Sequence, residues 1–121
     1  VRGVNHHPHD IEFTAQSAHP ALTRGRGAAF AWRDAMGVEK LVIVQEIDRH
    51  HRRDVNPEAV RGDLREAIMN EHELALHELV LIGPGQLPLT TSGKIRRNEA
   101  RRLWQEGAFL ESFNHSGEYS P

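Results

Sequence analysis

Short apolar runs predict the strands of this chain. Two of them are GAAFAW (27–32) and KLVIVQEI (40–47), which are rich in β-branched and aromatic residues and flank the turn-prone segment RDAMG. They predict an antiparallel hairpin whose two strands lie in the centre of a sheet. A third run, HELVLIG (77–83), predicts a third strand, and the glycines and prolines of GPGQLP mark the loop that follows it.

Helical spacing of apolar residues predicts one helix before these runs and another between the second run and the third. The first helix is expected over about residues 8–18, because Pro8 suits the opening position of a helix. The second is expected over about residues 57–72. Asn56 is a good N-cap residue, and Pro57 can take the first helical position after it.

A last helix is expected close to the C-terminal end of the sequence. It would begin with Asn98 as its N-cap and end near Gly107. Its apolar face would contain Ala100, Leu103 and Trp104.

The order of these elements predicts an α+β fold, in which helices pack on a small antiparallel sheet of about three strands. The chain has 121 residues, which suits one compact domain. We expect that domain to occupy residues 1–113 and the polar residues 114–121 to form a flexible tail. Because the sequence opens with VRG and has no initiator methionine, we expect it to be a piece of a longer protein.

Composition excludes several classes of function. The chain has no cysteine, which rules out a disulfide framework, a thiol nucleophile and cysteine-ligated zinc, and which favours a reducing compartment such as the cytoplasm. The formal net charge is −2, so the overall balance does not favour nucleic acid or an anionic membrane as a partner. The longest apolar run, AAFAW at residues 28–32, has five residues, far too few to span a membrane.

Lys94 is the residue with the most distinctive surroundings, because the segment TTSGKIRR places it in a turn of small residues before a basic stretch. A phosphate-binding P-loop would need glycine in place of Pro88 and Ser or Thr in place of Ile95, so that motif is excluded. A solvated turn lysine is the plain alternative. Gly93 nevertheless permits close backbone approach, and the small neighbours leave a long amine free to reach into a partner's cleft.

Two segments resemble motifs of the adenylate-forming ligases. LPLTTSGKIRR (87–97) resembles their motif PKTSSGKI, whose lysine enters the active site, and RGVNHHPHDIE (2–12) resembles their segment RGxRIEPxEIE. The second segment, followed by AHPAL and GAAFAW, is similar to the pattern RGRNHYPxDIE of the fatty acyl-AMP ligases. The chain departs from these patterns at His7, where tyrosine is usual, and at Leu89, where the first lysine of PKTSSGK is usual.

This resemblance covers about residues 1–110 and corresponds to the mobile C-terminal domain of those enzymes, an α+β domain with a lysine-bearing hairpin turn. It implies that a larger enzyme activates a fatty acid with ATP and Mg²⁺ to an acyl-adenylate. The acyl group would then pass to the phosphopantetheine thiol of an acyl carrier protein, with coenzyme A as the alternative acceptor if the enzyme is an acyl-CoA ligase. The pockets for ATP and fatty acid would lie in an N-terminal adenylation domain, the partner of this chain. The chain alone is expected to be inactive and to bind no cofactor.

The resemblance also implies roles for individual residues. Lys94 would be the catalytic cation of adenylation, in a substrate-binding turn formed with Thr91, Ser92 and Gly93. The segment that faces the thiol channel during acyl transfer would contain Arg2, Gly3, Val4 and Asn5. A nonribosomal-peptide adenylation domain is disfavoured, because that class usually has arginine and glutamate where Asn5 and His7 stand.

The histidines raise the question of a metal site, above all those near the start of the chain. His6 and Asp10 have the i, i+4 spacing of a helical zinc pair, but Pro8 lies between them. His7 and His9 are weighed with them, but adjacent histidines, such as His6 and His7, point opposite ways in an extended segment. We therefore expect surface or packing histidines and no metal site.

Two basic segments have alternative interpretations. Residues 49–53 are expected to form a solvated loop, with contact to an acidic carrier protein as the alternative. The basic patch of the last helix could bind nucleic-acid phosphates, which would make the chain a binding module. Its members are Arg96, Arg97, Arg101 and Arg102. The acidic overall balance and the lack of a nucleic-acid motif disfavour this function. A regulatory domain that has kept the fold and lost catalysis is the last alternative.

Overall fold

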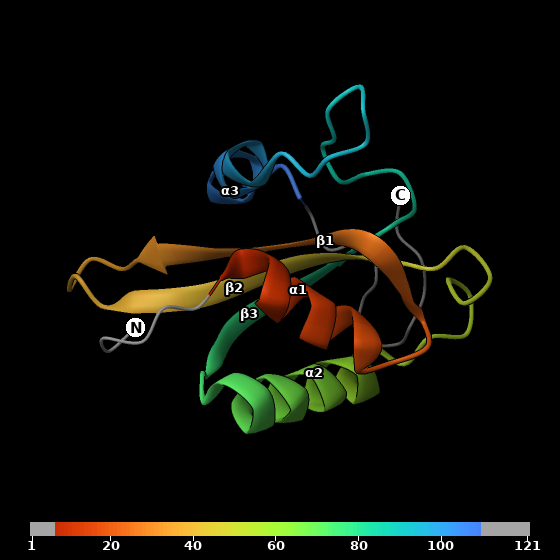
Figure 1. Cartoon of the computed structure of the whole chain (residues 1–121), viewed down its shortest axis with the longest axis horizontal. Coiled ribbons are helices and arrows are strands. Elements are labelled where there is room, and N and C mark those ends of the chain that lie inside the picture. Colours follow the sequence, from red (N-terminus) through yellow and green to blue (C-terminus); the bar gives the residue numbers. More distant parts are fainter. Residues whose placement is uncertain (1–6, 110–121) are drawn as a thin grey trace.

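The structure, a computed structural model, describes residues 7–109. Its elements follow in the order α1 (Pro8–Ser17), β1 (Leu22–Arg33), β2 (Glu39–Ile47), α2 (Pro57–His72), β3 (Leu76–Ile82) and α3 (Arg97–Gln105). The α+β class and the three-stranded sheet are therefore confirmed. Figure 1 shows helices on both sides of that sheet.

The sheet has the strand order β1-β2-β3. β1 and β2 form the predicted antiparallel hairpin, in which Phe30 pairs with Val42. β3 runs parallel to β2, with Val80 beside Val44, so the prediction of a fully antiparallel sheet is wrong. The reason is the connection: α2 carries the chain back along the sheet between β2 and β3, and a long crossover of this kind joins parallel strands.

The position of β1 also differs from the prediction. β2 is the central strand of the described sheet, whereas β1 lies at its edge. β2 is buried over both faces, which is why its sequence is a continuous apolar run and not an alternating one. The long apolar part of β1 is buried because α1 and α3 both pack against this strand.

Two apolar cores lie on opposite faces of the sheet, because successive strand residues point to opposite sides. Ile43 belongs to the core under α1 and α2, whereas Val42 and Val44 belong to the other core. The second core is covered by Ala100 of α3 and by Leu87 of the loop before it. In Figure 1, α2 lies below the sheet, and α3 lies above it with the cyan loop that precedes it. The candidate lysine is thus carried on the face opposite α2.

The predicted start of α2 is confirmed in detail. The Asn56 side chain accepts hydrogen bonds from the backbone N–H groups of Glu58 at 3.1 Å and Ala59 at 3.3 Å. Pro57 follows as the first helical residue. The helix ends at His72, as expected.

The predicted cap of α3 is wrong. The N-cap residue is Arg96 and not Asn98, and its side chain makes no capping hydrogen bond. The start is set by the preceding loop, because the Arg96 N–H donates to the Pro88 carbonyl oxygen at 3.0 Å and fixes the chain there. The predicted end is confirmed, since Gly107 follows the helix with φ of 74°, a conformation that glycine adopts readily.

The expected boundary between a domain and a tail at residues 113 and 114 lies outside the described residues. Within residues 7–109, no helix is long and apolar enough to cross a bilayer.

Candidate functional site

Residues 87–97 form a tight hairpin with Lys94 near its tip, and we call this segment the lysine hairpin. Leu89 and Ile95 form an antiparallel bridge. Nearer the tip, the Thr90 N–H donates to the Lys94 carbonyl oxygen at 2.8 Å, and the Gly93 N–H donates to the Thr90 carbonyl oxygen at 2.9 Å. Gly93 has φ of 87°, in the left-handed region where a side chain is unfavourable. The predicted lysine-bearing hairpin turn is therefore confirmed.

Hydroxyl groups order the tip of the lysine hairpin. Thr90 Oγ1 accepts a hydrogen bond from the Lys94 N–H at 3.0 Å and lies 3.1 Å from Ser92 Oγ. Thr91, Ser92, Gly93 and Lys94 are all exposed. No carboxylate of residues 7–109 pairs with the Lys94 ammonium group, so this charge is presented to the outside of the domain.

The C-terminal end of the lysine hairpin is bound to α1 by an ion pair. Arg97 Nε donates to Glu12 Oε2 at 2.6 Å, and Arg97 Nη2 donates to Glu12 Oε1 at 2.8 Å. The Glu12 side chain is almost fully buried, and its Oε2 also accepts a hydrogen bond from the Ala29 N–H of β1 at 2.8 Å. The hydrogen bonds to Glu12 raise the pKa of the Arg97 guanidinium above its ordinary value. One carboxylate thus joins a helix, a strand and the lysine hairpin.

The N-terminal end of the lysine hairpin is held by a second buried carboxylate. Glu46 of β2 is 2 % exposed. Its two oxygens accept hydrogen bonds from the N–H groups of Gly85 at 3.0 Å and Leu87 at 2.9 Å. The loop predicted from GPGQLP is therefore present, and it is bound to the central strand.

The contact between Glu12 and Arg97 joins the two segments that resemble motifs of the adenylate-forming ligases. Glu12 belongs to the segment at residues 2–12 and Arg97 to the segment at residues 87–97, although 85 positions separate them. No role for Glu12, Glu46 or Thr90 was predicted from the sequence. The available signal was the presence of a carboxylate among apolar neighbours, because a buried carboxylate needs hydrogen-bond donors. The predicted thiol-transfer residues Arg2, Gly3, Val4 and Asn5 lie outside the described residues.

The histidines and the aspartate that were weighed as possible metal ligands lie near the start of α1 in the sequence. No group of three or more potential ligands within residues 7–109 could hold a metal ion. His9 Nε2 lies 3.4 Å from an oxygen of Asp10, and the His9 ring lies 6.0 Å from the ring of His7. His6 lies outside the described residues.

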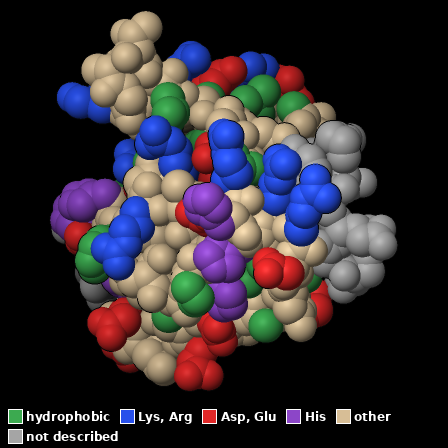
Figure 2. All heavy atoms as spheres, turned by 90° about the vertical axis from the view of Figure 1, so that its right-hand side faces the viewer, with side chains coloured by type: hydrophobic (Ala, Val, Ile, Leu, Met, Phe, Trp, Pro, Cys, Tyr) green, Lys and Arg blue, Asp and Glu red, His purple; other side chains and the backbone are tan. Residues whose placement is uncertain are grey.

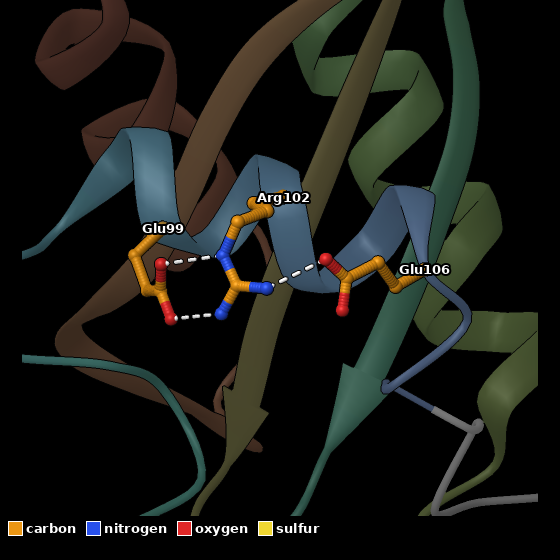
Figure 3. A network of polar contacts seen from close by, with 3 residues as sticks. All are labelled: Glu99, Arg102 and Glu106. Carbon is orange, nitrogen blue, oxygen red and sulfur yellow. Dashed lines mark hydrogen bonds and ion pairs between the residues drawn. The ribbon is translucent and has the colours of Figure 1, made fainter.

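Carboxylates neutralise half of the predicted basic patch. Arg97 pairs with Glu12, and Arg102 is held between Glu99 and Glu106, as Figure 3 shows. Figure 2 shows Lys and Arg side chains in a band across one face of the molecule, with His, Asp and Glu side chains beside them. A surface of mixed sign does not favour a nucleic-acid partner.

The basic run at residues 49–53 lies in the loop between β2 and α2, as predicted. Asp48 organises this loop, because its Oδ1 accepts a hydrogen bond from the His50 N–H at 2.8 Å. This hydrogen bond lowers the pKa of the Asp48 carboxyl below its ordinary value.

Comparison with known proteins identifies the family. The sequence profile of a family described as Disco-interacting protein 2-like, AMP domain, matches residues 1–112. The chain belongs to this family.

Two curated relatives show which kind of enzyme contains a segment similar to this chain. The chain is 42% identical over 107 residues to the medium-chain-fatty-acid–[acyl-carrier-protein] ligase JamA of Moorena producens (strain JHB). It is also 42% identical over 110 residues to the long-chain-fatty-acid–AMP ligase FadD23 of Mycobacterium tuberculosis (strain CDC 1551 / Oshkosh). These matches cover 88% and 90% of this chain but only 18% of each relative. The resemblance to fatty acyl-AMP ligases is confirmed, for a segment that spans a small part of such an enzyme.

Solved structures share the fold. The fatty acid AMP ligase from Legionella pneumophila has a TM-score of 0.67 and 31% identity, over 84% of this chain and 18% of that protein. The structure of McyG A-PCP complexed with phenylalanyl-adenylate has a TM-score of 0.80 at 20% identity, over 91% of this chain and 20% of that protein, which shows the fold alone. The predicted fold of an adenylate-forming enzyme domain is confirmed.

Proposed function

We propose that this chain is the lysine-bearing domain of an ATP-dependent fatty acyl-AMP ligase. The observation that carries the proposal is the position of Lys94, an exposed cation at the tip of a hairpin whose two ends are bound to the rest of the domain by buried carboxylates. A hairpin anchored in this way can present a charge to a partner surface without deforming. The names of the relatives supply the reaction class.

In the proposed reaction, a fatty acid carboxylate oxygen attacks the α-phosphorus of ATP. The bond from the α-phosphorus to the bridging oxygen breaks, pyrophosphate leaves, and acyl-adenylate forms. Both reactants are anionic, so a cation placed at the carboxylate and α-phosphate oxygens lowers the barrier. Lys94 supplies that cation, and Thr91, Ser92 and Gly93 form the substrate-binding turn beside it.

The ATP and fatty acid pockets belong, in this proposal, to an N-terminal adenylation domain. Mg²⁺ would accompany the triphosphate of ATP, with its protein ligands in that adenylation domain. The domain comprises residues 1–113, with a tail at residues 114–121. An enzyme that consumes ATP in this way would work in the cytoplasm, where ATP is available. The chain alone would not turn over substrate.

In the second half-reaction, a thiol gives up its proton and its sulfur attacks the acyl carbonyl carbon of the adenylate. The bond from that carbon to the phosphate oxygen breaks, a thioester forms and AMP leaves. The name of JamA supports the phosphopantetheine thiol of an acyl carrier protein as the acceptor. Arg2, Gly3, Val4 and Asn5 would form the segment that meets this thiol arm. A second candidate is coenzyme A, because a relative with 39% identity over 113 residues is named putative fatty-acid–CoA ligase fadD25.

The test uses a ligase in which this chain is joined to its adenylation domain. Pyrophosphate release with laurate and ATP measures adenylation, and transfer from added lauroyl-adenylate to a carrier protein or to coenzyme A measures the second step. Lys94→Ala should lower the adenylation rate about a hundred- to a thousand-fold. It should leave transfer nearly unchanged. Full adenylation by this variant would refute the proposal, and the acylated product would identify the acceptor.

A further inference from the structure

The lysine hairpin is held at its two ends by carboxylates that come from different elements. Glu46 of β2 binds the backbone where the hairpin begins, and Glu12 of α1 binds the side chain of Arg97, where it ends. Both carboxylates are buried, with exposed fractions of 2 % for Glu46 and 5 % for Glu12. Glu46 binds backbone N–H groups, whereas Glu12 binds a side chain of the lysine hairpin, that of Arg97.

The geometry around Glu12 permits little freedom. The Arg97 guanidinium meets both carboxylate oxygens, at 2.6 and 2.8 Å, and this two-pronged contact fixes direction as well as distance. The Ala29 N–H donates to the same carboxylate at 2.8 Å and holds it against β1. A buried carboxylate that loses its cation is strongly disfavoured, so the pair resists opening.

The ion pair lies close to Lys94 along the chain. Only Ile95 and Arg96 separate Lys94 from Arg97, and Ile95 is itself paired with Leu89 across the hairpin. The Arg96 N–H donates to the Pro88 carbonyl oxygen at 3.0 Å. A shift of Arg97 would therefore be transmitted through paired backbone to the tip that carries the lysine.

We propose that Glu12, acting through Arg97, is a positioning residue that sets the direction of Lys94 for adenylation. This inference rests on the function proposed above and deepens it. Glu12 does not touch the reactants. Its contribution is to make the lysine hairpin, α1 and β1 one rigid unit, so that the Lys94 ammonium reaches the reacting oxygens in one orientation.

A positioning role for Glu12 predicts different effects on the two half-reactions. A misplacement of about 1 Å by a change remote from the reacting atoms can lower a rate as much as a hundred-fold. In the joined ligase, Glu12→Gln should therefore lower the turnover number of adenylation by about ten- to a hundred-fold. The KM for ATP should change little, since Lys94 acts on the transition state. Acyl transfer from added lauroyl-adenylate should be unchanged.

The chosen substitution is nearly isosteric. An amide at position 12 would turn one acceptor oxygen into a donor that faces Arg97 or the Ala29 N–H. Arg97→Lys is the second variant, which keeps the positive charge but cannot make the two-pronged contact. Arg97→Lys should show the same loss of adenylation as Glu12→Gln, and it replaces that variant in the test if Glu12→Gln fails to fold.

A matched control lies in the first turn of α3, where Glu99 is half-buried. Glu99 forms a two-pronged contact with Arg102, with hydrogen bonds of 2.9 and 2.5 Å. Within the described chain, neither side chain makes a hydrogen bond or ion pair with residues 87–95. Glu99→Gln should leave both half-reactions unchanged. A loss of adenylation in this variant as large as that in Glu12→Gln would overturn the proposal.

The decisive measurement combines substitutions. If Glu12 acts through Lys94, the double variant Glu12→Gln/Lys94→Ala should adenylate no more slowly than Lys94→Ala alone. Additive losses would overturn the positioning role, as would equal losses of adenylation and transfer. The failure of the wider proposal is distinguishable, because it requires Lys94→Ala itself to retain adenylation. If Lys94→Ala loses adenylation while Glu12→Gln and Arg97→Lys keep it, only the positioning role fails.

Discussion

The Glu46 carboxylate of the central strand lies 2.9 Å from the backbone nitrogen of Leu87, 41 positions further along the chain. The same carboxylate also accepts the Gly85 N–H at 3.0 Å. Leu87 in turn fills the core beneath α3. The polar bond and the apolar contact therefore fix the same short segment, which leads into the lysine hairpin.

Glu46→Gln should consequently destabilise the domain. The amide NH₂ group of glutamine would face a backbone N–H at a buried position, so two donors would meet and one hydrogen bond would be lost. This should lower the free energy of unfolding by about 1–3 kcal/mol. Urea unfolding of the chain measures this change. Glu66→Gln on the exposed side of α2 is the control and should leave the midpoint unchanged. Equal midpoints for both variants would show that the contacts of Glu46 contribute nothing.

Two glycines should respond to alanine in opposite directions. A Cβ at Gly27 would clash with Gln45 Oε1. The Gln45 side chain is fully buried and donates to the Thr23 and Glu46 carbonyl oxygens. Gly27→Ala should therefore lower the free energy of unfolding by about 1–3 kcal/mol, as overpacking does. Nothing lies within 4 Å of a Cβ at Gly62 inside α2, so Gly62→Ala should stabilise by about 0.5–1 kcal/mol.

Thermal and urea unfolding of both alanine variants test this contrast. If Gly27→Ala does not change the free energy of unfolding, Gln45 moves aside without losing its hydrogen bonds. A destabilising Gly62→Ala would mean that the helix carries a constraint other than the entropy of glycine.

Local patterns in the sequence predict the elements of this fold but not all of their relations. Asn56 followed by Pro57 gives the start of α2, because the cap depends on neighbouring residues alone. The direction of β3 does not follow from its apolar run, since a fully buried strand has the same composition in parallel and antiparallel pairs. The alternation of β2, α2 and β3 along the chain was the available signal for a parallel pair.

The candidate site shows the same limit. Lys94 and the glycine turn are recognisable because their chemistry lies in consecutive residues. The two buried carboxylates are not recognisable in this way, because Glu12 and Glu46 find their partners 85 and 41 positions away. Likewise, Asn98 is a good cap by residue type, but the hydrogen bond between Arg96 and Pro88 starts α3 earlier.

The ion pairs of α3 predict a pH effect that is confined to one helix. The hydrogen bonds from Arg102 lower the pKa of the Glu99 carboxyl below its ordinary value. A lowered pKa means that the pair stabilises the folded state above the pKa of the unfolded chain, about 4.3 for Glu. This contribution is lost as the pH falls through the lower value of the folded state.

Carboxyl ¹³C NMR of the chain measures the Glu99 titration directly. Arg102→Gln should move its midpoint upward, toward about 4.3. Arg65→Gln, which removes an exposed charge from α2, should leave the Glu99 midpoint where it is. An unchanged midpoint in Arg102→Gln would show that the contact in Figure 3 does not persist in solution.

Lys94→Arg separates the need for a charge from the need for an ammonium group. Lys94 is exposed, so the substitution should leave the melting temperature of the chain unchanged. The adenylation rate of the joined ligase should nevertheless stay at least about ten-fold below that of the parent, because a planar guanidinium cannot meet both sets of reacting oxygens as a compact, rotatable ammonium does. Arg101→Ala, which removes an exposed charge from α3, is the control and should leave adenylation unchanged. Full adenylation by Lys94→Arg would mean that position 94 needs only a positive charge and not the compact, rotatable ammonium group.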